Sequence, residues 1–298
     1  MMKNLISLPI LGLLINAIVW GLSWIAFQDA AARGLHPLWM TAAINGFAVL
    51  VLCAYRPRVL GEVFRTPALL GVLVAAGLTN VCFNTAVTVG DVLRVTLLFY
   101  LMPVWAALLA HWFLGEKLDL TAGLRLAVGL CGAGLVLWST KTGLPVPQGW
   151  GDWLGIAGGV GFALNNVMLR RAHAASDTGR GIAMFVGGFL CSAVLAAILA
   201  GLGYMSWPSQ IPTIHYSDIV LNLVFWSVLF FAANMGVQYG AARLPANLTA
   251  LIMLFEVAVA AVSSIALGAA VLRWQDAVGG VLILAAPFLF STLKNKDA

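Results

Sequence analysis

The sequence predicts an all-α polytopic membrane protein: ten transmembrane helices in two inverted five-helix repeats, with both termini in the cytoplasm. Three observations predict this fold. Hydrophobic residues make up 62% of the 298 positions and charged residues only 9%, about a third of the charged share of a typical soluble domain. Apolar runs about as long as a membrane-spanning helix recur along the whole chain. The two halves of the chain also share a pattern of residues.

The apolar runs are separated by short segments that carry charges, glycines or prolines. Only helices and closed barrels satisfy every backbone polar group inside lipid, and the runs lack strand-like alternation, so each run is predicted to be a helix. The expected spans are 8–28, 37–54, 67–89, 92–113, 121–140, 150–170, 181–203, 217–241, 246–268 and 274–292.

The positive charges predict the orientation of these spans. Twelve of the 16 basic residues fall at the chain ends or in the even-numbered connections. Only Arg33, Arg94, Lys141 and Arg273 fall in the odd-numbered ones. Because basic residues accumulate in cytoplasmic connections, both termini are expected in the cytoplasm. The protein itself is expected to be a multi-pass protein of a bacterial inner membrane. The charges stand singly in short connections, which argues against nucleic-acid binding.

Several classes of protein find no support in the sequence. The four cysteines, Cys53, Cys82, Cys131 and Cys191, lie in apolar runs without metal-binding spacing, so neither a metal site nor a cofactor is predicted. There is no G-x-x-x-x-G-K-[ST] phosphate loop, so direct coupling to ATP is not expected. A membrane-embedded enzyme usually needs paired acids or a His/Cys/Ser set at depth, so an enzyme is not predicted.

An internal repeat is the most informative pattern. Residues 94–115 align without a gap on residues 247–268, so that Thr96 meets Thr249 and each segment ends in Leu-Gly. The chain then divides into two five-helix units, 1–143 and 148–298. An odd number of spans in each unit forces the two units to insert in opposite directions. Such repeats hold the substrate near the middle of the membrane, between the halves.

Short motifs in the first half resemble a known family. Residues 102–110 read Met-Pro-Val-Trp-Ala-Ala-Leu-Leu-Ala, residues 113–116 read Phe-Leu-Gly-Glu, and Trp20-Gly21 stands in the first span. Together they resemble the EamA-type branch of the drug/metabolite transporter superfamily, across two tandem five-helix units. The overall likeness is greatest to bacterial aromatic amino-acid exporters.

The second half departs from the family pattern. Glu256 is followed by Val257 where the family often has proline, and Gly268 by Ala269 where it often has glutamate. The resemblance implies a secondary transporter that exports amino acids, aromatic and other neutral ones, or similar small metabolites by alternating access. The alternatives are a drug or other-metabolite exporter of the same superfamily and a non-transporting membrane protein. The expected partners are a small solute and the bilayer; an obligatory protein partner is not indicated, and a monomer is one open option.

Glu256 is the outstanding candidate for function, because it is the only acidic residue in the central third of any predicted span. A carboxylate in lipid costs several kcal/mol, so such residues usually face a cavity and have a role. Glu256 is therefore predicted to bind a substrate ammonium or to carry a coupling proton. The alternative is a neutral side chain that joins two helices by hydrogen bonds.

Further candidates come from polar and aromatic residues spaced one helical turn apart, which project from one face of a helix. Amides can bind both ends of an amino acid, and aromatic rings can hold a flat side chain or a cation. Interhelical packing is the alternative for each residue. The predicted substrate-binding residues are Trp20, Trp24, Asn80, Asn84, Tyr100, Asn165, Asn166, Asn234, Gln238 and Glu256.

Three other features lead to structural expectations. Pro103 is predicted to hinge or statically kink its helix, because proline leaves a backbone carbonyl unpaired. Asp91 and Arg94 are expected at the membrane interface beside an outer connection, where charge is tolerated. Glycines at 151, 155 and 159 are expected to let a neighbouring helix of the same chain approach closely.

Overall fold

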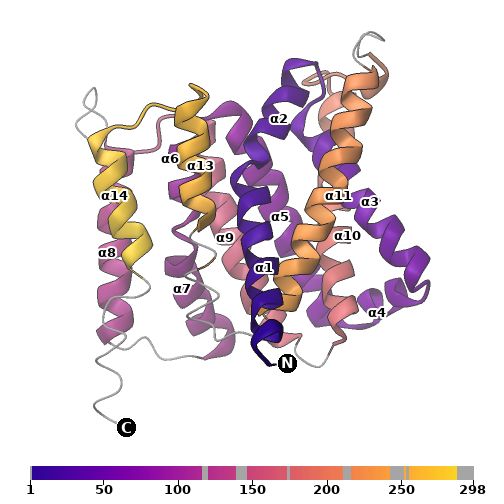
Figure 1. The fold of residues 1–298 in the computed structure, drawn as a ribbon, viewed down its shortest axis with the longest axis horizontal. Coiled ribbons are helices and arrows are strands. Elements are labelled where there is room, and N and C mark those ends of the chain that lie inside the picture. The colour runs from indigo at the N-terminus through magenta and orange to yellow at the C-terminus, as the bar shows by residue number, and fades with distance from the viewer. Residues whose placement is uncertain are drawn as a thin grey trace.

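A computed structural model describes residues 2–115, 120–138, 146–172, 175–210, 216–241, 252 and 255–286 (Figure 1). These ranges fold into a bundle of helices joined by short connections. The helices, in chain order, are α1 (Met2–Gly21), α2 (Ser23–Ala32), α3 (Pro37–Tyr55), α4 (Val59–Arg65), α5 (Pro67–Val89), α6 (Val92–Phe99), α7 (Met102–Leu114), α8 (Leu120–Leu137), α9 (Trp150–Arg171), α10 (Asp177–Gly201), η1 (Pro208–Gln210), α11 (Tyr216–Ala241), α13 (Phe255–Ala266) and α14 (Trp274–Ala285).

The bundle has the composition of a multi-pass membrane protein. Polar side chains such as Asn16 and Thr41 are buried, whereas Leu50 and Val262 are 71% and 69% exposed. An apolar exterior around a partly polar interior suits lipid as the surrounding solvent. Within the described residues, six segments are long and apolar enough to cross a membrane: 8–32, 37–55, 67–89, 92–113, 178–201 and 216–237. Shorter apolar helices cover 127–136, 255–266 and 274–285.

Helix α9 is long enough to span the membrane, yet it is rich in glycine and asparagine. Its main neighbours are α5, α6 and α7. A Cβ on Gly155 would lie 3.1 Å from the carbonyl oxygen of Val95, and one on Gly159 would lie 2.6 Å from that of Phe99. Gly151 similarly contacts Gly90, which follows the end of α5. The expected close approach along this glycine face is confirmed, and it lies within one chain.

Two predicted spans contain breaks. The first divides at Leu22 into α1 and α2, and the fourth divides at residues 100–101 into α6 and α7. Pro103 stands in the first turn of α7, where its missing N–H leaves little unsatisfied. The break therefore lies just before the proline, and whether it moves as a hinge stays a prediction.

Two crossings bring glycine against glycine. Gly12 of α1 meets Gly236 of α11, where a Cβ on either would lie 2.7–2.8 Å from the other's carbonyl oxygen. Gly132 of α8 meets Gly279 of α14 in the same way, at 2.6–2.7 Å, and these two helices stand side by side in Figure 1. Each crossing joins a helix of the first half of the chain to one of the second.

We expect Gly279→Ala to destabilise the protein by about 1–3 kcal/mol, because the new methyl group overpacks a backbone contact. Gly123→Ala in α8 is the matched control, since nothing lies within 4 Å of a Cβ there. Alanine has the higher helix propensity, so this control should be neutral or stabilise by up to about 1 kcal/mol. Thermal unfolding in detergent measures both. Equal stability changes would contradict the close crossing.

A polar contact joins α4 to the start of α10. Ser176 caps α10 by accepting a hydrogen bond from the N–H of Gly179 at 2.9 Å. The N–H of Ser176 donates to Oε1 of Glu62 at 2.8 Å, and its hydroxyl donates to Oε2 at 2.7 Å. These two bonds hold the pKa of the Glu62 carboxyl below its usual value.

We expect Glu62→Gln to lower stability near neutral pH by at most about 1 kcal/mol, since this contact borders solvent. A carboxyl whose pKa is lower in the folded state stabilises the fold above its unfolded pKa, and that contribution disappears as pH falls through the folded pKa. The melting temperatures of the variant and the wild type should therefore converge in acid. A difference that persists in acid would contradict this role of the carboxylate.

Candidate substrate-binding cavity

A cavity of about 240 Å³ lies inside the bundle, among α1, α3, α5, α6, α7, α9, α10, α11 and α13. One water needs about 10–15 Å³ by the same measure, so the cavity has room for a small metabolite. Its lining residues are Asn16, Trp20, Asn45, Ala76, Thr79, Asn80, Phe83, Phe99, Tyr100, Met102, Phe162, Asn165, Asn166, Leu169, Met184, Phe185, Asn234, Val237 and Glu256.

Glu256 enters the cavity from the first turn of α13 and is 7% exposed. The hydroxyl of Tyr100, at the break between α6 and α7, shares a hydrogen bond with its carboxyl group. At the break between α1 and α2, a Cβ on Gly21 would lie 2.8 Å from the backbone oxygen of Glu256. The two helix breaks therefore both lie next to Glu256.

Three asparagines of the lining have fixed amide orientations. The Nδ2 of Asn45 donates to the carbonyl oxygen of Thr41 at 2.9 Å. Asn80 and Asn234 likewise donate to the carbonyl oxygens four residues earlier, at 2.9 and 2.8 Å. A backbone carbonyl can only accept, so it determines which end of each amide carries the nitrogen. Each of these lining amides keeps its Oδ1 as an acceptor and one further N–H as a donor.

Asn165 and Asn166 also line the cavity, from consecutive positions of α9. Asn165 is 5% exposed, and its Oδ1 has no hydrogen-bond partner among the described residues. A buried, unpaired amide oxygen costs about 1–3 kcal/mol. Such a cost is recovered when a ligand donates to that oxygen.

The structure separates two predicted pairs. Trp20 lines the cavity, whereas Trp24 lies in α2, is 5% exposed and donates its indole N–H to the hydroxyl of Ser263 at 3.0 Å. Asn80 lines the cavity, whereas Asn84 donates to the hydroxyl of Thr41 at 3.0 Å and borders a small adjoining void. The side chain of Gln238 lies outside the described residues, as does that of Pro103.

Aromatic rings form one wall of the cavity. Ring centroids lie 6.3 Å apart for Trp20 and Phe83, 4.6 Å for Phe83 and Phe99, and 5.6 Å for Phe99 and Phe162. The sequence analysis missed these phenylalanines, because phenylalanine is common in any apolar span. It also missed Asn16, although Asn16 stands one turn before Trp20, and Asn45, an amide inside an apolar run.

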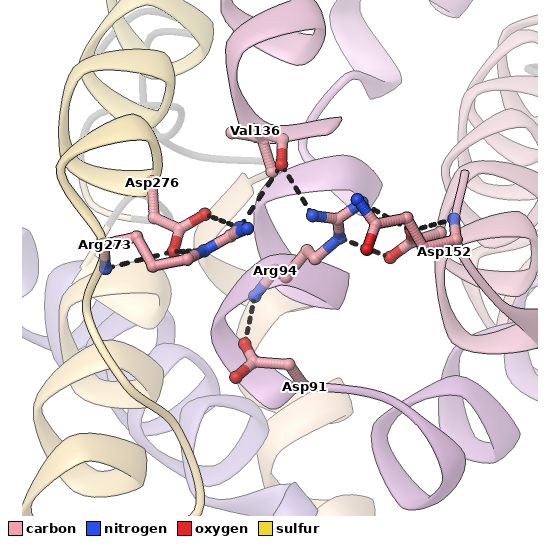
Figure 2. Close-up of polar contacts among 7 residues, drawn as sticks. Asp91, Arg94, Val136, Asp152, Arg273 and Asp276 are labelled. Atoms are coloured by element: carbon pink, nitrogen blue, oxygen red, sulfur yellow. Dashed lines mark hydrogen bonds and ion pairs between the residues drawn. The ribbon is translucent and has the colours of Figure 1, made fainter. Parts of the chain in front are cut away.

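A second polar cluster lies away from the cavity, and Figure 2 shows it. Arg94, in the first turn of α6, is 7% exposed. Its guanidinium donates to both carboxylate oxygens of Asp152 in α9, at 2.7 and 2.6 Å, and to the carbonyl oxygen of Val136 in α8 at 2.8 Å. The expected interfacial position of Arg94 stays a prediction, and the structure adds a partner that the sequence did not indicate: Asp152, from the other half of the chain, pairs with it inside the protein.

The cluster continues to α14. Arg273 bonds Asp276 through two nitrogens and also donates to the carbonyl oxygen of Val136 at 3.3 Å (Figure 2). Asp91 caps α6 by accepting from the N–H of Arg94 at 2.9 Å. Burial raises the pKa of the Asp91 carboxyl. The cluster therefore ties α6 and α8 of the first half to α9 and α14 of the second.

Comparison with known proteins finds a family model that matches part of the chain. No curated protein matches the sequence. A solved structure, described only as "Crystal structure of protein", is similar over 98% of this chain and 99% of its own, with 18% identity and a TM-score of 0.59. This likeness shows a shared fold. Residues 7–138 match the EamA-like transporter family.

Proposed function

We propose that the chain is a secondary transporter that exports amino acids, aromatic and other neutral ones, or similar small metabolites by alternating access. The observation that carries the proposal is a cavity inside an apolar bundle, whose described lining combines aromatic rings, amides and the carboxyl group of Glu256. Ionisable residues at such depth usually serve a solute or a proton. The match of residues 7–138 to a transporter family supports the same function.

The proposed architecture has ten spans in two inverted repeats, 1–143 and 148–298. The protein would lie in a bacterial inner membrane, with both termini in the cytoplasm. The helix contacts support this architecture, because a contact between two helices recurs between the corresponding helices of the opposite halves. The contact of α1 with α11 corresponds to that of α9 with α5, and the contact of α1 with α13 to that of α9 with α6 and α7. Helices α8 and α14, the last of each repeat, contact each other.

Reconstitution tests the proposal. Purified protein in liposomes should exchange labelled phenylalanine and other neutral amino acids with saturable kinetics. Ala76→Phe, which fills the cavity from α5, should reduce exchange at least tenfold. Val74→Phe is the matched control on the same helix, because Val74 is 58% exposed on the outer surface, and it should leave exchange unchanged. Absence of saturable flux for every amino acid, or equal flux in both variants, would contradict the proposal.

A further inference from the structure

The charge of the cavity is one-sided. Among the described residues that line it, Glu256 is the only charged one, and Lys, Arg and His are absent. An amino acid carries an ammonium group and a carboxylate. Its ammonium would find a carboxylate partner here, whereas its carboxylate would find no cation. Charge complementarity across a binding site determines which ligands it selects.

The fixed amides add to this asymmetry. One N–H of each of Asn45, Asn80 and Asn234 is bonded to its own helix, which leaves the Oδ1 of each amide as an acceptor, beside one further N–H. Together with Glu256, these lining residues supply acceptors from α3, α5, α11 and α13. A primary ammonium group has three donors and no acceptor, so it matches such a surface.

The aromatic wall suits the same ligand. Trp20, Phe83, Phe99 and Phe162 offer ring surfaces beside these acceptors. Aromatic faces attract cations and also pack against a flat apolar group.

Resting on the proposed transport function, we infer that the cavity recognises a primary ammonium group on an apolar or aromatic body, and that the substrate needs no carboxylate. The substrate class is thereby extended from amino acids to primary amines. The acceptors of α3, α5, α11 and α13 bind the ammonium group. The rings hold the body.

Four ligands with the same phenyl ring and two-carbon chain test this inference: 2-phenylethylamine, phenylalanine, 3-phenylpropionate and 2-phenylethanol. Binding to the purified protein in detergent is measured by calorimetry. The amine should bind at least as tightly as phenylalanine, and the acid and the alcohol at least tenfold more weakly. Tenfold tighter binding of phenylalanine than of the amine, or competition by the acid, would overturn the inference.

Two variants of α11 provide the matched comparison. Asn234→Ala removes one acceptor and should weaken amine binding about three- to tenfold, the effect of one hydrogen bond, without changing binding of the alcohol. Asn222→Ala should change neither, because Asn222 lies outside the cavity lining and donates to Asp29. Equal effects of both variants would overturn the assignment of Asn234.

The outcomes also separate this inference from the transport function. Saturable phenylalanine exchange that the amine does not inhibit would overturn the inference and leave the proposed transporter standing. Exchange or binding of the amine alone would support the inference and exclude amino acids as substrates. Absence of binding by both the amine and phenylalanine would contradict both proposals.

Discussion

Asp152→Ala is expected to lower the free energy of unfolding by about 3–5 kcal/mol, because it leaves the guanidinium of Arg94 buried without its counterion. Each side chain of this pair is 8% exposed, and two hydrogen bonds of 2.6–2.7 Å join them. Denaturation of the purified protein in detergent measures the change.

The control breaks a more exposed ion pair that has a single bond of the same length. Arg33 bonds Asp218 at 2.6 Å, but the Asp218 side chain is 52% exposed and Arg33 also pairs with Asp29. Asp218→Ala should therefore reduce stability by at most about 1 kcal/mol. The double variant Arg94→Met, Asp152→Leu should recover most of the loss, because it removes both buried charges. Equal effects of the two alanine substitutions would contradict the burial of Arg94.

Helix positions were predictable where local signals mark the ends. Prolines at 37 and 67 begin α3 and α5, and Gly90 follows the end of α5, so these bounds agree with the expected spans within a residue. A proline at the start of a helix and a glycine after its end act through the backbone of the same residues. Such signals need no knowledge of distant contacts.

The break inside the first span was not predictable from composition, whereas Pro103 marks the break inside the fourth. Leu22 is an ordinary apolar residue, and the α1–α2 break lies where Gly21 packs against α13, more than 230 positions later. The break also explains why Trp20 lines the cavity and Trp24 does not. One-turn spacing places two residues on one face only while the helix continues. Here they belong to two helices, and only Trp20 reaches the cavity.

Polar pairs between residues far apart in the sequence could not be predicted either. Arg94 and Asp152 are 58 positions apart, and neither residue carries a local sign of its partner. A burial pattern in the sequence shows which positions are apolar, but it does not show which charges meet in three dimensions. Glu256 was identifiable because its own position, deep in an apolar run, is unusual without reference to any partner.

Glu256→Gln is expected to reduce amino-acid or amine flux in liposomes about tenfold to hundredfold, the effect of one hydrogen bond to a charged group. Glutamine keeps the size of the side chain and can still accept from Tyr100, so stability should change by less than about 1 kcal/mol. The variant lacks the negative charge that we propose holds the ammonium group. It also lacks a group that can release a proton.

Measuring the flux at two proton gradients distinguishes binding of the ammonium group from coupling of a proton. If Glu256 couples a proton to transport, the residual flux of the variant will no longer respond to the gradient, whereas the wild-type flux will. Glu62→Gln makes the same chemical change at the contact of α4 with α10, away from the cavity, and should leave both flux and gradient response intact. A group that binds the solute or moves its proton cannot be neutralised without a change in flux. If Glu256→Gln keeps the wild-type flux under every gradient, this carboxyl group is therefore only a structural link between α13 and Tyr100.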